Sequence, residues 1–332
     1  MTTTRTIAGK PVNAIGLGCM NVAWAYGTAP ERGDALALFR AALDAGYNHF
    51  DTANIYGLGL SEEILGEAIM DRRDEFFLAS KTGIVVGEAT GGRGIDCSPE
   101  AITRSLDESL RRLGTDHLDL FYMHRLDPEV PIADSVGAMV RAIEAGKIGG
   151  YGVSEWSAAH VREAHSVHPV SAVQSEYSPW TRNPELGVLE TTRELGIAFV
   201  AFSPVARGAL AGAIRDPEAL PESDLRRTMP RFDARNWPAN LRLIEQFDAL
   251  AAEAGVTPAQ LSLAWVLSRG EHVHAIPGTA SAAHMRENLA ASSCTLAPEV
   301  LDRAGALINQ HTIAGHRYSA KGQATIDTEE FA

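Results

Sequence analysis

The stretch ERGDALALFRAALDAGYNHFDTANIYG, residues 31–57, carries the pattern that decides the fold. Its first part, residues 31–46, has apolar residues at the i, i+3, i+4 spacing of an amphipathic helix. The short apolar run NHFDTA, residues 48–53, follows it and is typical of a buried strand. The strand ends in an acid, Asp51, and the loop after it carries a phenol, Tyr56. The stretch therefore predicts a helix, a buried strand and a polar strand end.

The same alternation runs along most of the chain. Further helical patterns cover residues 61–71, 98–114, 134–147, 158–165, 185–196, 257–270 and 281–292. Further buried strands are expected at residues 13–18, 76–81, 118–124, 149–154, 172–178, 198–204 and 274–278. Eight strand–helix alternations predict an α/β fold of the (β/α)8 (TIM) barrel type. A doubly wound sheet usually opens with a GxGxxG turn, whereas residues 16–21 are GLGCMN.

Three segments fall outside this alternation. Residues 4–13 have β-branched arms around the turn AGKP and predict an N-terminal hairpin. A loop rich in Pro, Arg and Asp runs from about Val205 to Pro238, and residues 311–332 form a tail. Because long loops are usually functional lids or disordered, we expect the first to cover a ligand. Whether the end of the tail is ordered stays open, and residues 1–332 are expected to form one barrel domain.

The charge and the cysteines limit the classes of partner. The formal net charge is -13, from 29 basic and 42 acidic residues. Nucleic acids and anionic membranes are usually bound by basic surfaces, so neither partner is expected. The three cysteines, Cys19, Cys97 and Cys294, form no CxxC pair, and no apolar run has the length of a signal or a membrane span. A cytoplasmic protein with reduced thiols and no metal site is predicted.

Polar residues gather where the predicted strands end. They are Asp51, Lys81, His124, Ser154, Gln174 and Ser203, with Tyr56 shortly after the second strand. In a barrel the carboxyl ends of the strands carry the chemistry. Each residue also has a structural explanation, because Asp51 can cap a turn, Lys81 can be a surface lysine and His124 can be a core histidine.

Four of these residues together suit general acid catalysis. A lysine close to the Tyr56 phenol stabilises the phenolate and is expected to lower its pKa from about 10 toward neutral pH. Asp51 would hold Lys81 charged and oriented, and His124 could donate a hydrogen bond to a substrate oxygen. The set predicts an acid that protonates a developing alkoxide.

Eight motifs resemble the aldo-keto reductases. HFDTANIYG, SEEILGEAI, ASKTG, LGTDHLDLFYMHR, GKIGGYGVSEW, QSEYS, AFSPVARGAL and AIPGTASAAHMREN occur in the order and spacing of this family over nearly the whole chain. The resemblance implies a barrel with its bottom closed by the hairpin and with long loops at the rim. It also implies metal-free, NAD(P)H-dependent reduction of a small-molecule aldehyde or ketone to an alcohol.

The resemblance assigns roles to single residues. It implies that Tyr56 is the proton donor, Lys81 its pKa partner, Asp51 the lysine's counter-ion and His124 the group that orients the carbonyl. The nicotinamide would lie on side chains at the fifth to seventh strand ends, the pyrophosphate on the loop that follows, and the adenosine on the segment after the eighth strand. The implied cofactor residues are Met20, Asp51, Ser154, Gln174, Phe202, Ser203, Pro204, Val205, Gly208, Leu210, Gly278, Thr279, Ser281, His284, Glu287 and Asn288.

The sequence departs from the family pattern at four of its positions. Glu155 stands where many members have Asn, and it is expected to be a weaker cofactor contact because a carboxylate only accepts hydrogen bonds. Phe202 replaces a common Tyr and keeps the stacking face. Gly278 and His284 stand where many members have Lys and Arg, whose charges bind the 2′-phosphate of NADP. NADPH, with Arg207 as a source of positive charge, is still expected, and NADH is the alternative.

The rim loops should form the substrate pocket. The residues expected there are Trp24, Tyr26, Ile84, Arg125 and Trp180. Aromatic walls suit an apolar or aromatic carbonyl compound. Arg125 could meet an acidic substrate group, or form a salt bridge with Asp127.

Two other functions stay open. A Schiff-base lyase would use Lys81 as the nucleophile. A regulatory subunit would bind the nicotinamide cofactor and report its redox state to a partner protein. The sequence does not determine the oligomeric state.

Overall fold

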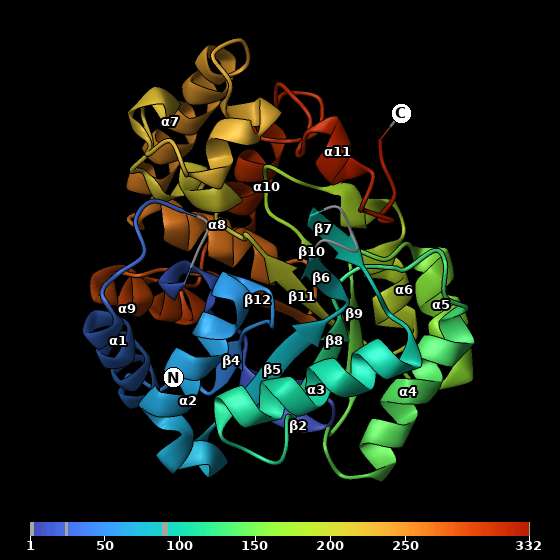
Figure 1. The fold of residues 1–332 in the computed structure, drawn as a ribbon. Helices are drawn as coiled ribbons and strands as arrows, with labels where there is room; N and C mark the ends of the chain where they lie inside the picture. Colours follow the sequence, from blue (N-terminus) through green and yellow to red (C-terminus); the bar gives the residue numbers. More distant parts are fainter. Residues whose placement is uncertain (1–2, 24–25, 88–91, 332) are drawn as a thin grey trace.

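The strands form a closed barrel. A computed structural model describes residues 3–23, 26–87 and 92–331. Its main sheet has eight strands in the order β12-β11-β10-β9-β8-β5-β4-β3, and all neighbouring strands are parallel (Figure 1). These strands are β3 (Leu17–Gly18), β4 (His49–Asp51), β5 (Phe77–Thr82), β8 (Leu120–Met123), β9 (Tyr151–Ser154), β10 (Ala172–Glu176), β11 (Ala198–Phe202) and β12 (Val273–Ile276). Bridges Ile15–Ala275 and Gly18–Gly278 join the first strand to the last. The predicted (β/α)8 barrel is confirmed.

Helices cover the outside of the barrel, as the alternation predicts. They are α1 (Arg32–Asp44), α2 (Leu60–Ile69), α3 (Pro99–Leu113), α4 (Ile132–Glu144), α5 (Ala158–Val167), α6 (Val188–Glu194), α8 (Pro258–Leu267) and α9 (Ala282–Ala290). The sequence also specifies where some of them begin. Ser98 caps α3, and Thr257 with Gln260 forms a capping box at the start of α8, which satisfies backbone N–H groups that the helix leaves free. Of the described helices, none combines the length and apolar character needed to cross a membrane.

The N-terminal hairpin closes the bottom of the barrel. β1 (Thr4–Ile7) and β2 (Lys10–Asn13) pair antiparallel over the predicted residues. Ile7 and Val12 are buried in one cluster with inward-facing side chains of the strands, among them Phe77 and Leu120. The hairpin therefore excludes water from the end of the barrel opposite the strands' carboxyl ends.

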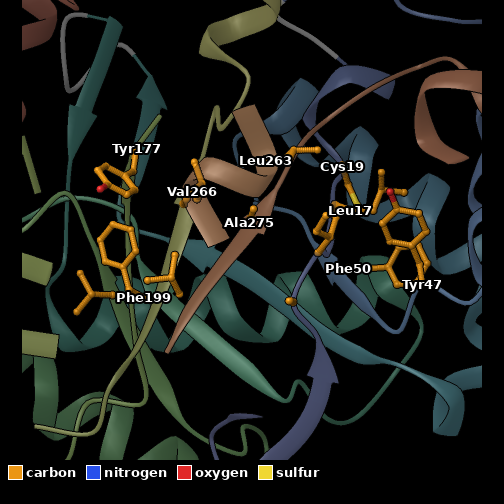
Figure 2. Packing of buried hydrophobic residues seen from close by; sticks show 14 of the residues in the cluster. Leu17, Cys19, Tyr47, Phe50, Tyr177, Phe199, Leu263, Val266 and Ala275 are labelled. Atoms are coloured by element: carbon orange, nitrogen blue, oxygen red, sulfur yellow. Dashed lines mark hydrogen bonds between the residues drawn. The ribbon is translucent and has the colours of Figure 1, made fainter. Parts of the chain in front are cut away.

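A second apolar layer fills the space between the strands and the helices. Figure 2 shows Phe50 beside Tyr47 on one side of this layer, and Phe199 beside Tyr177 on another. The rings of Tyr177 and Phe199 meet edge to face at 5.7 Å, and the Tyr47 hydroxyl donates to the carbonyl of Met285 at 2.8 Å. Such packing fixes the positions of the strands, and with them the side chains at the strand ends.

The rim carries three additions to the barrel. A hairpin of β6 (Ile84–Gly87) and β7 (Gly92–Ile95), which was not predicted, follows β5. After β11, short 3-10 turns lead into α7 (Trp237–Glu253). After α10 (Pro298–Leu307), the tail returns to the rim and includes α11 (Ala320–Gln323) (Figure 1).

Two buried histidines lie inside the barrel. The rings of His49 on β4 and His274 on β12 are fully buried and 6.5 Å apart. No carboxylate of the described residues lies within ion-pair distance of either ring. Burial, followed by nearby positive charge, lowers the pKa of His49 to about 4, and burial next to His49 lowers the pKa of His274 to about 3. Both rings are therefore neutral in the folded protein at pH 7.

These histidines should make the protein sensitive to acid. Because their folded-state pKa values lie below the ordinary 6.5, only the unfolded chain takes up protons between about pH 6.5 and 4. The free energy of unfolding should fall across this window, by up to about 1.4 kcal/mol per pH unit for each ring. In urea titrations, His274→Leu should lose less stability than the wild type between pH 6.5 and 4.5.

The control variant is His311→Leu, which removes an exposed ring from the tail. It should follow the wild-type pH dependence. An unchanged pH dependence in His274→Leu would contradict the assignment of buried neutral rings.

Candidate active site

A cavity of about 790 Å³ opens at the carboxyl ends of the strands. Three of the four predicted catalytic side chains line it: Asp51, Tyr56 and His124. Lys81 lies directly behind them with a fully buried side chain. The structure therefore brings together four residues that lie far apart in the chain, from Asp51 to His124.

Lys81 and Asp51 form a buried ion pair because their strands are neighbours. β4 pairs with β5, and the Lys81 ammonium donates to Asp51 and to the carbonyl of Thr52 at 2.7 Å. Burial alone would lower the pKa of Lys81, but Asp51 and Tyr56 raise it overall. The lysine is therefore a charged ammonium at neutral pH.

Tyr56 reaches this ammonium through the loop after β4. The loop stays attached to β5, because the N–H groups of Thr52 and Asn54 donate to the carbonyls of Ala79 and Lys81 at 2.9 and 3.2 Å. The Lys81 ammonium lies 3.4 Å from the Tyr56 hydroxyl. The short loop thus carries the phenol from the strand end to the cavity wall.

The net pKa of Tyr56 differs from the prediction. Burial raises it above the ordinary value of 10, although the charges of Lys81 and Arg125 act in the opposite direction. The expected net lowering is wrong because the desolvation of a buried phenolate outweighs its stabilisation by the ammonium. Tyr56 is protonated throughout the neutral range, which is the state that a proton donor requires.

His124 presents a neutral imidazole to the same place. Burial and the charges of Arg125, Lys81 and Arg93 hold its pKa well below 6.5. Its ring lies 6.0 Å from the Tyr56 ring at 82°. Its Nδ1 is buried without a hydrogen-bond partner in the described chain.

Gln174 and Ser154 lie on the neighbouring strand ends β10 and β9. The Gln174 amide donates to the second oxygen of Asp51 at 2.8 Å and lines the cavity. Ser154 is paired with Gln174 across the sheet but does not line the cavity. Its buried hydroxyl has no hydrogen-bond partner among the described residues, which is rare for a buried polar group.

The loop after β11 forms another wall. Phe202, Ser203, Pro204, Val205 and Gly208 line the cavity, as does Met20 from the first strand end, whereas Leu210 is buried beneath the wall. The backbone adopts positive φ at Ser203 (49°), Ala206 (52°), Arg207 (56°) and Gly208 (91°). Successive turns of this kind direct N–H groups to one side, which suits an anion.

The segment after β12 lines the opposite end of this wall. Its cavity-lining residues are Gly278, Thr279, Ser281, His284, Glu287 and Asn288. Ser281 caps the start of α9, so the helix N-terminus lies at the cavity. A Cβ at Gly278 would lie 2.3 Å from the Asn21 side-chain oxygen, which would have to move, and 3.1 Å from the Gly18 carbonyl oxygen.

The predicted substrate residues divide into three groups. Tyr26, Ile84 and Arg125 line the cavity. Trp180 does not: it is buried beside Phe232, at 6.0 Å between ring centroids. Trp24 lies outside the described residues. Arg93, Tyr318 and Lys321 also line the cavity, and they were not predicted because they belong to the unforeseen hairpin and to the tail.

The tail is held to the rim by a buried ion pair. Arg317 lies 3.0 Å from Glu155, and their side chains are 2% and 0% exposed. The same carboxylate accepts from the Thr328 hydroxyl and from the Glu176 N–H, both at 2.8 Å. Glu155 therefore anchors the tail, a role that explains a carboxylate at this position.

Comparisons with known proteins agree with this geometry. Residues 14–309 match the Aldo/keto reductase family. The chain is 39% identical over 320 residues to the NADP(+) aldo-keto reductase yakc of Schizosaccharomyces pombe, covering 95% of this chain and 94% of that protein. It also resembles the structure of a glycerol dehydrogenase from Gluconobacter oxydans (TM-score 0.84, 27% identity, 95% of this chain and 98% of that one). An aldo-keto reductase from Klebsiella pneumoniae in complex with NADPH has a TM-score of 0.73 at 27% identity, covering 96% of this chain and 99% of that one.

The barrel, its cavity and these matches define an oxidoreductase that acts on carbonyl compounds. The chain belongs to the aldo/keto reductase family, as its motifs predict.

Replacing the carboxylate of Glu155 should loosen the tail. Glu155→Gln removes the buried counter-ion of Arg317 and leaves only the partly exposed Glu330 at 3.4 Å, and breaking a buried pair costs about 3–5 kcal/mol. The tail should open more often, so trypsin should cleave after Lys321 at least about tenfold faster than in the wild type. Mass spectrometry of timed digests measures this rate.

Glu253→Gln is the matched control, since it breaks an ion pair with Arg303 whose side chains are 61% and 55% exposed. Such pairs contribute little, and the cleavage rate should stay at the wild-type level. Equal rates in both variants would show that Glu155 does not hold the tail.

Proposed function

We propose that the protein reduces an aldehyde or ketone to an alcohol with NADPH, and that Tyr56 donates the proton. The observation that carries this proposal is the Lys81 ammonium, 3.4 Å from the Tyr56 hydroxyl behind the cavity wall. A charged donor at this place stabilises the phenolate that remains after proton transfer. The protonated phenol and the neutral imidazole of His124 both face the space where a carbonyl oxygen would lie.

The residues around the cavity fit a dinucleotide. The unpartnered hydroxyl of Ser154, beside Gln174, suits the carboxamide of a nicotinamide. The turned backbone after β11 and the N-terminus of α9 suit phosphate groups. These walls would hold the cofactor, and Phe202, which lines the cavity, would pack against the nicotinamide ring. A bound NADPH supplies the hydride that reduces the carbonyl carbon.

Each of the four catalytic residues has its own role in the transfer of the proton. Tyr56 gives its proton to the oxygen as negative charge develops there. Lys81 stabilises the resulting phenolate, and Asp51 holds the ammonium at the end of β5. The Nε2–H of His124 donates a hydrogen bond to the same oxygen and orients the carbonyl.

NADPH is proposed over NADH, although the adenosine end carries no strong cation. The cavity wall along α9 contains His284 and Glu287 but no Lys or Arg of the described residues. Support for NADPH comes from the NADP(+) specified in the name of the yeast relative and from the NADPH complex of the Klebsiella pneumoniae protein. The phosphate would be held by His284, the Ser281 hydroxyl and backbone N–H groups.

The lyase alternative has little support in the geometry. A Schiff-base lysine has to reach the substrate as a neutral amine. Lys81 does not line the cavity, and its ammonium is bound to Asp51, Thr52 and Tyr56.

We also propose a cytoplasmic location, supported by three free cysteines.

Removal of the phenol should abolish most turnover. Tyr56→Phe keeps the ring and removes only the proton donor, so kcat should fall by about 10²–10⁴-fold. NADPH binding, measured by quenching of protein fluorescence, should be retained. Tyr47→Phe is the matched control, because it removes a remote hydroxyl that is bonded to the Met285 carbonyl. A Tyr56→Phe variant with wild-type kcat would exclude Tyr56 as the proton donor.

The cofactor preference can be tested at His284. Steady-state kinetics should give a higher kcat/KM with NADPH than with NADH for the wild type. His284→Arg should raise kcat/KM for NADPH by about tenfold, since a charge-assisted bond to a phosphate replaces a weak one. The value for NADH, which lacks the phosphate, is the internal control. An equal or better kcat/KM with NADH in the wild type would overturn the preference.

A further inference from the structure

Among the described residues, five Lys and Arg side chains line the cavity, and they differ in how their charge is balanced. Arg207 is bound to Glu176 at 2.6 Å and also donates to the hydroxyls of Tyr26 and Tyr318. Arg226 is bound to Asp224 at 2.7 Å. Both guanidinium groups are therefore committed to neighbouring residues. The other three cations in the wall are Arg93, Arg125 and Lys321.

Arg93 and Arg125 have no carboxylate partner within the described chain. The guanidinium of Arg125 donates to the carbonyl of His124 at 2.6 Å. Asp127, which could have paired with it, instead accepts from the N–H groups of Cys97 and Glu129 at 2.8 and 3.0 Å.

The two arginines lie near each other and near the reacting groups. Arg93 lines the cavity but remains exposed to solvent, and its pKa is lowered by partial desolvation and then by the charge of Arg125. Both charges also contribute to the low pKa of His124. Two like charges beside a cavity repel each other, and a bound anion would relieve this repulsion.

Arg93 and Arg125 lie on the side of the barrel opposite the proposed cofactor walls. Arg93 follows β5, and Arg125 follows β8. In the closed strand order, β5 lies across from β11, and β8 lies across from β12. Among the described residues, the carboxylates in the cavity wall are Asp51, which is paired with Lys81, and Glu287, which lies on α9. The wall around the two arginines is therefore positively charged, even though the whole chain carries a net charge of -13.

We infer that the substrate is an aldehyde or ketone that carries a carboxylate, which the guanidinium groups of Arg93 and Arg125 bind beside Tyr56. This inference rests on the proposed reductase function. The carbonyl lies at Tyr56 and His124, and the carboxylate points toward the β6–β7 hairpin. Guanidinium groups suit a carboxylate because they present several N–H donors in a plane. Arg93 and Arg125 thus determine specificity.

The test compares formylbenzoates with their methyl esters, which have the same aldehyde and ring but no charge. The 2-, 3- and 4-isomers sample different separations of carbonyl and carboxylate. For at least one isomer, kcat/KM should be about 10- to 100-fold higher for the acid than for the ester, as expected for charged hydrogen bonds. The advantage should shrink as ionic strength rises.

Variants assign this advantage to the two arginines. In Arg93→Gln and in Arg125→Gln, the acid-to-ester ratio of kcat/KM should fall about tenfold, mainly through a higher KM for the acid. An indirect effect on His124 would change acid and ester alike and leave the ratio unchanged. Arg125→Lys should restore part of the ratio. Arg303→Gln, on the distant α10, should keep the wild-type ratio.

The outcomes separate this inference from the proposed function. If the esters are reduced with NADPH but no acid is preferred, the carboxylate site is refuted and the reductase function stands. If neither acids nor esters are reduced, both proposals fail. A preference for the acid that survives in both Gln variants would also overturn the assignment to these residues.

Discussion

The ion pair between Lys81 and Asp51 is the interaction on which the site depends. Removing two charges from water is expensive, and the cost is recovered only when close geometry and further hydrogen bonds satisfy both groups. Here the Thr52 carbonyl, the Tyr56 hydroxyl and the Gln174 amide complete the pair. The closed barrel and the hairpin that plugs its bottom shield this set from water on the side away from the cavity. Burial also strengthens the catalytic effect of the pair, because in a low dielectric the Lys81 ammonium stabilises the phenolate form of Tyr56 more strongly than it would in water.

The same balance of burial and pairing recurs around the rim. Glu155 with Arg317, Glu176 with Arg207, and Asp224 with Arg226 are largely buried pairs that fix the strand ends, the long loop and the tail to one another. Arg93 and Arg125, by contrast, line the cavity without a carboxylate partner among the described residues. Because Arg207 and Arg226 are paired with acids while these two arginines lie near Tyr56 and His124, the two arginines are the ones proposed to bind a ligand.

The sequence predicted what depends on local pattern. Apolar runs and helical spacing located the eight strands and their helices, and the polar residues that end these strands located the tetrad, because barrel geometry brings strand ends together. What it could not predict depends on contacts between distant segments. Glu155 and Arg317 are 162 residues apart, and nothing near either one indicates the other. Trp180 was expected in the pocket, but its ring packs against Phe232 instead. The pKa of Tyr56 depends on its degree of burial, which no motif specifies.

The hydrogen bonds of Arg207 have a consequence for redesign. Its guanidinium joins Tyr26, which is 181 residues earlier, to Tyr318, which is 111 residues later, and to Glu176 beneath them. A loop grafted in place of the Tyr26 segment, or a tail taken from another barrel, would leave this guanidinium with unmet N–H groups. The first rim loop, the Arg207 turn and the tail therefore form one exchangeable module. Transplanting specificity into this scaffold means moving all three together.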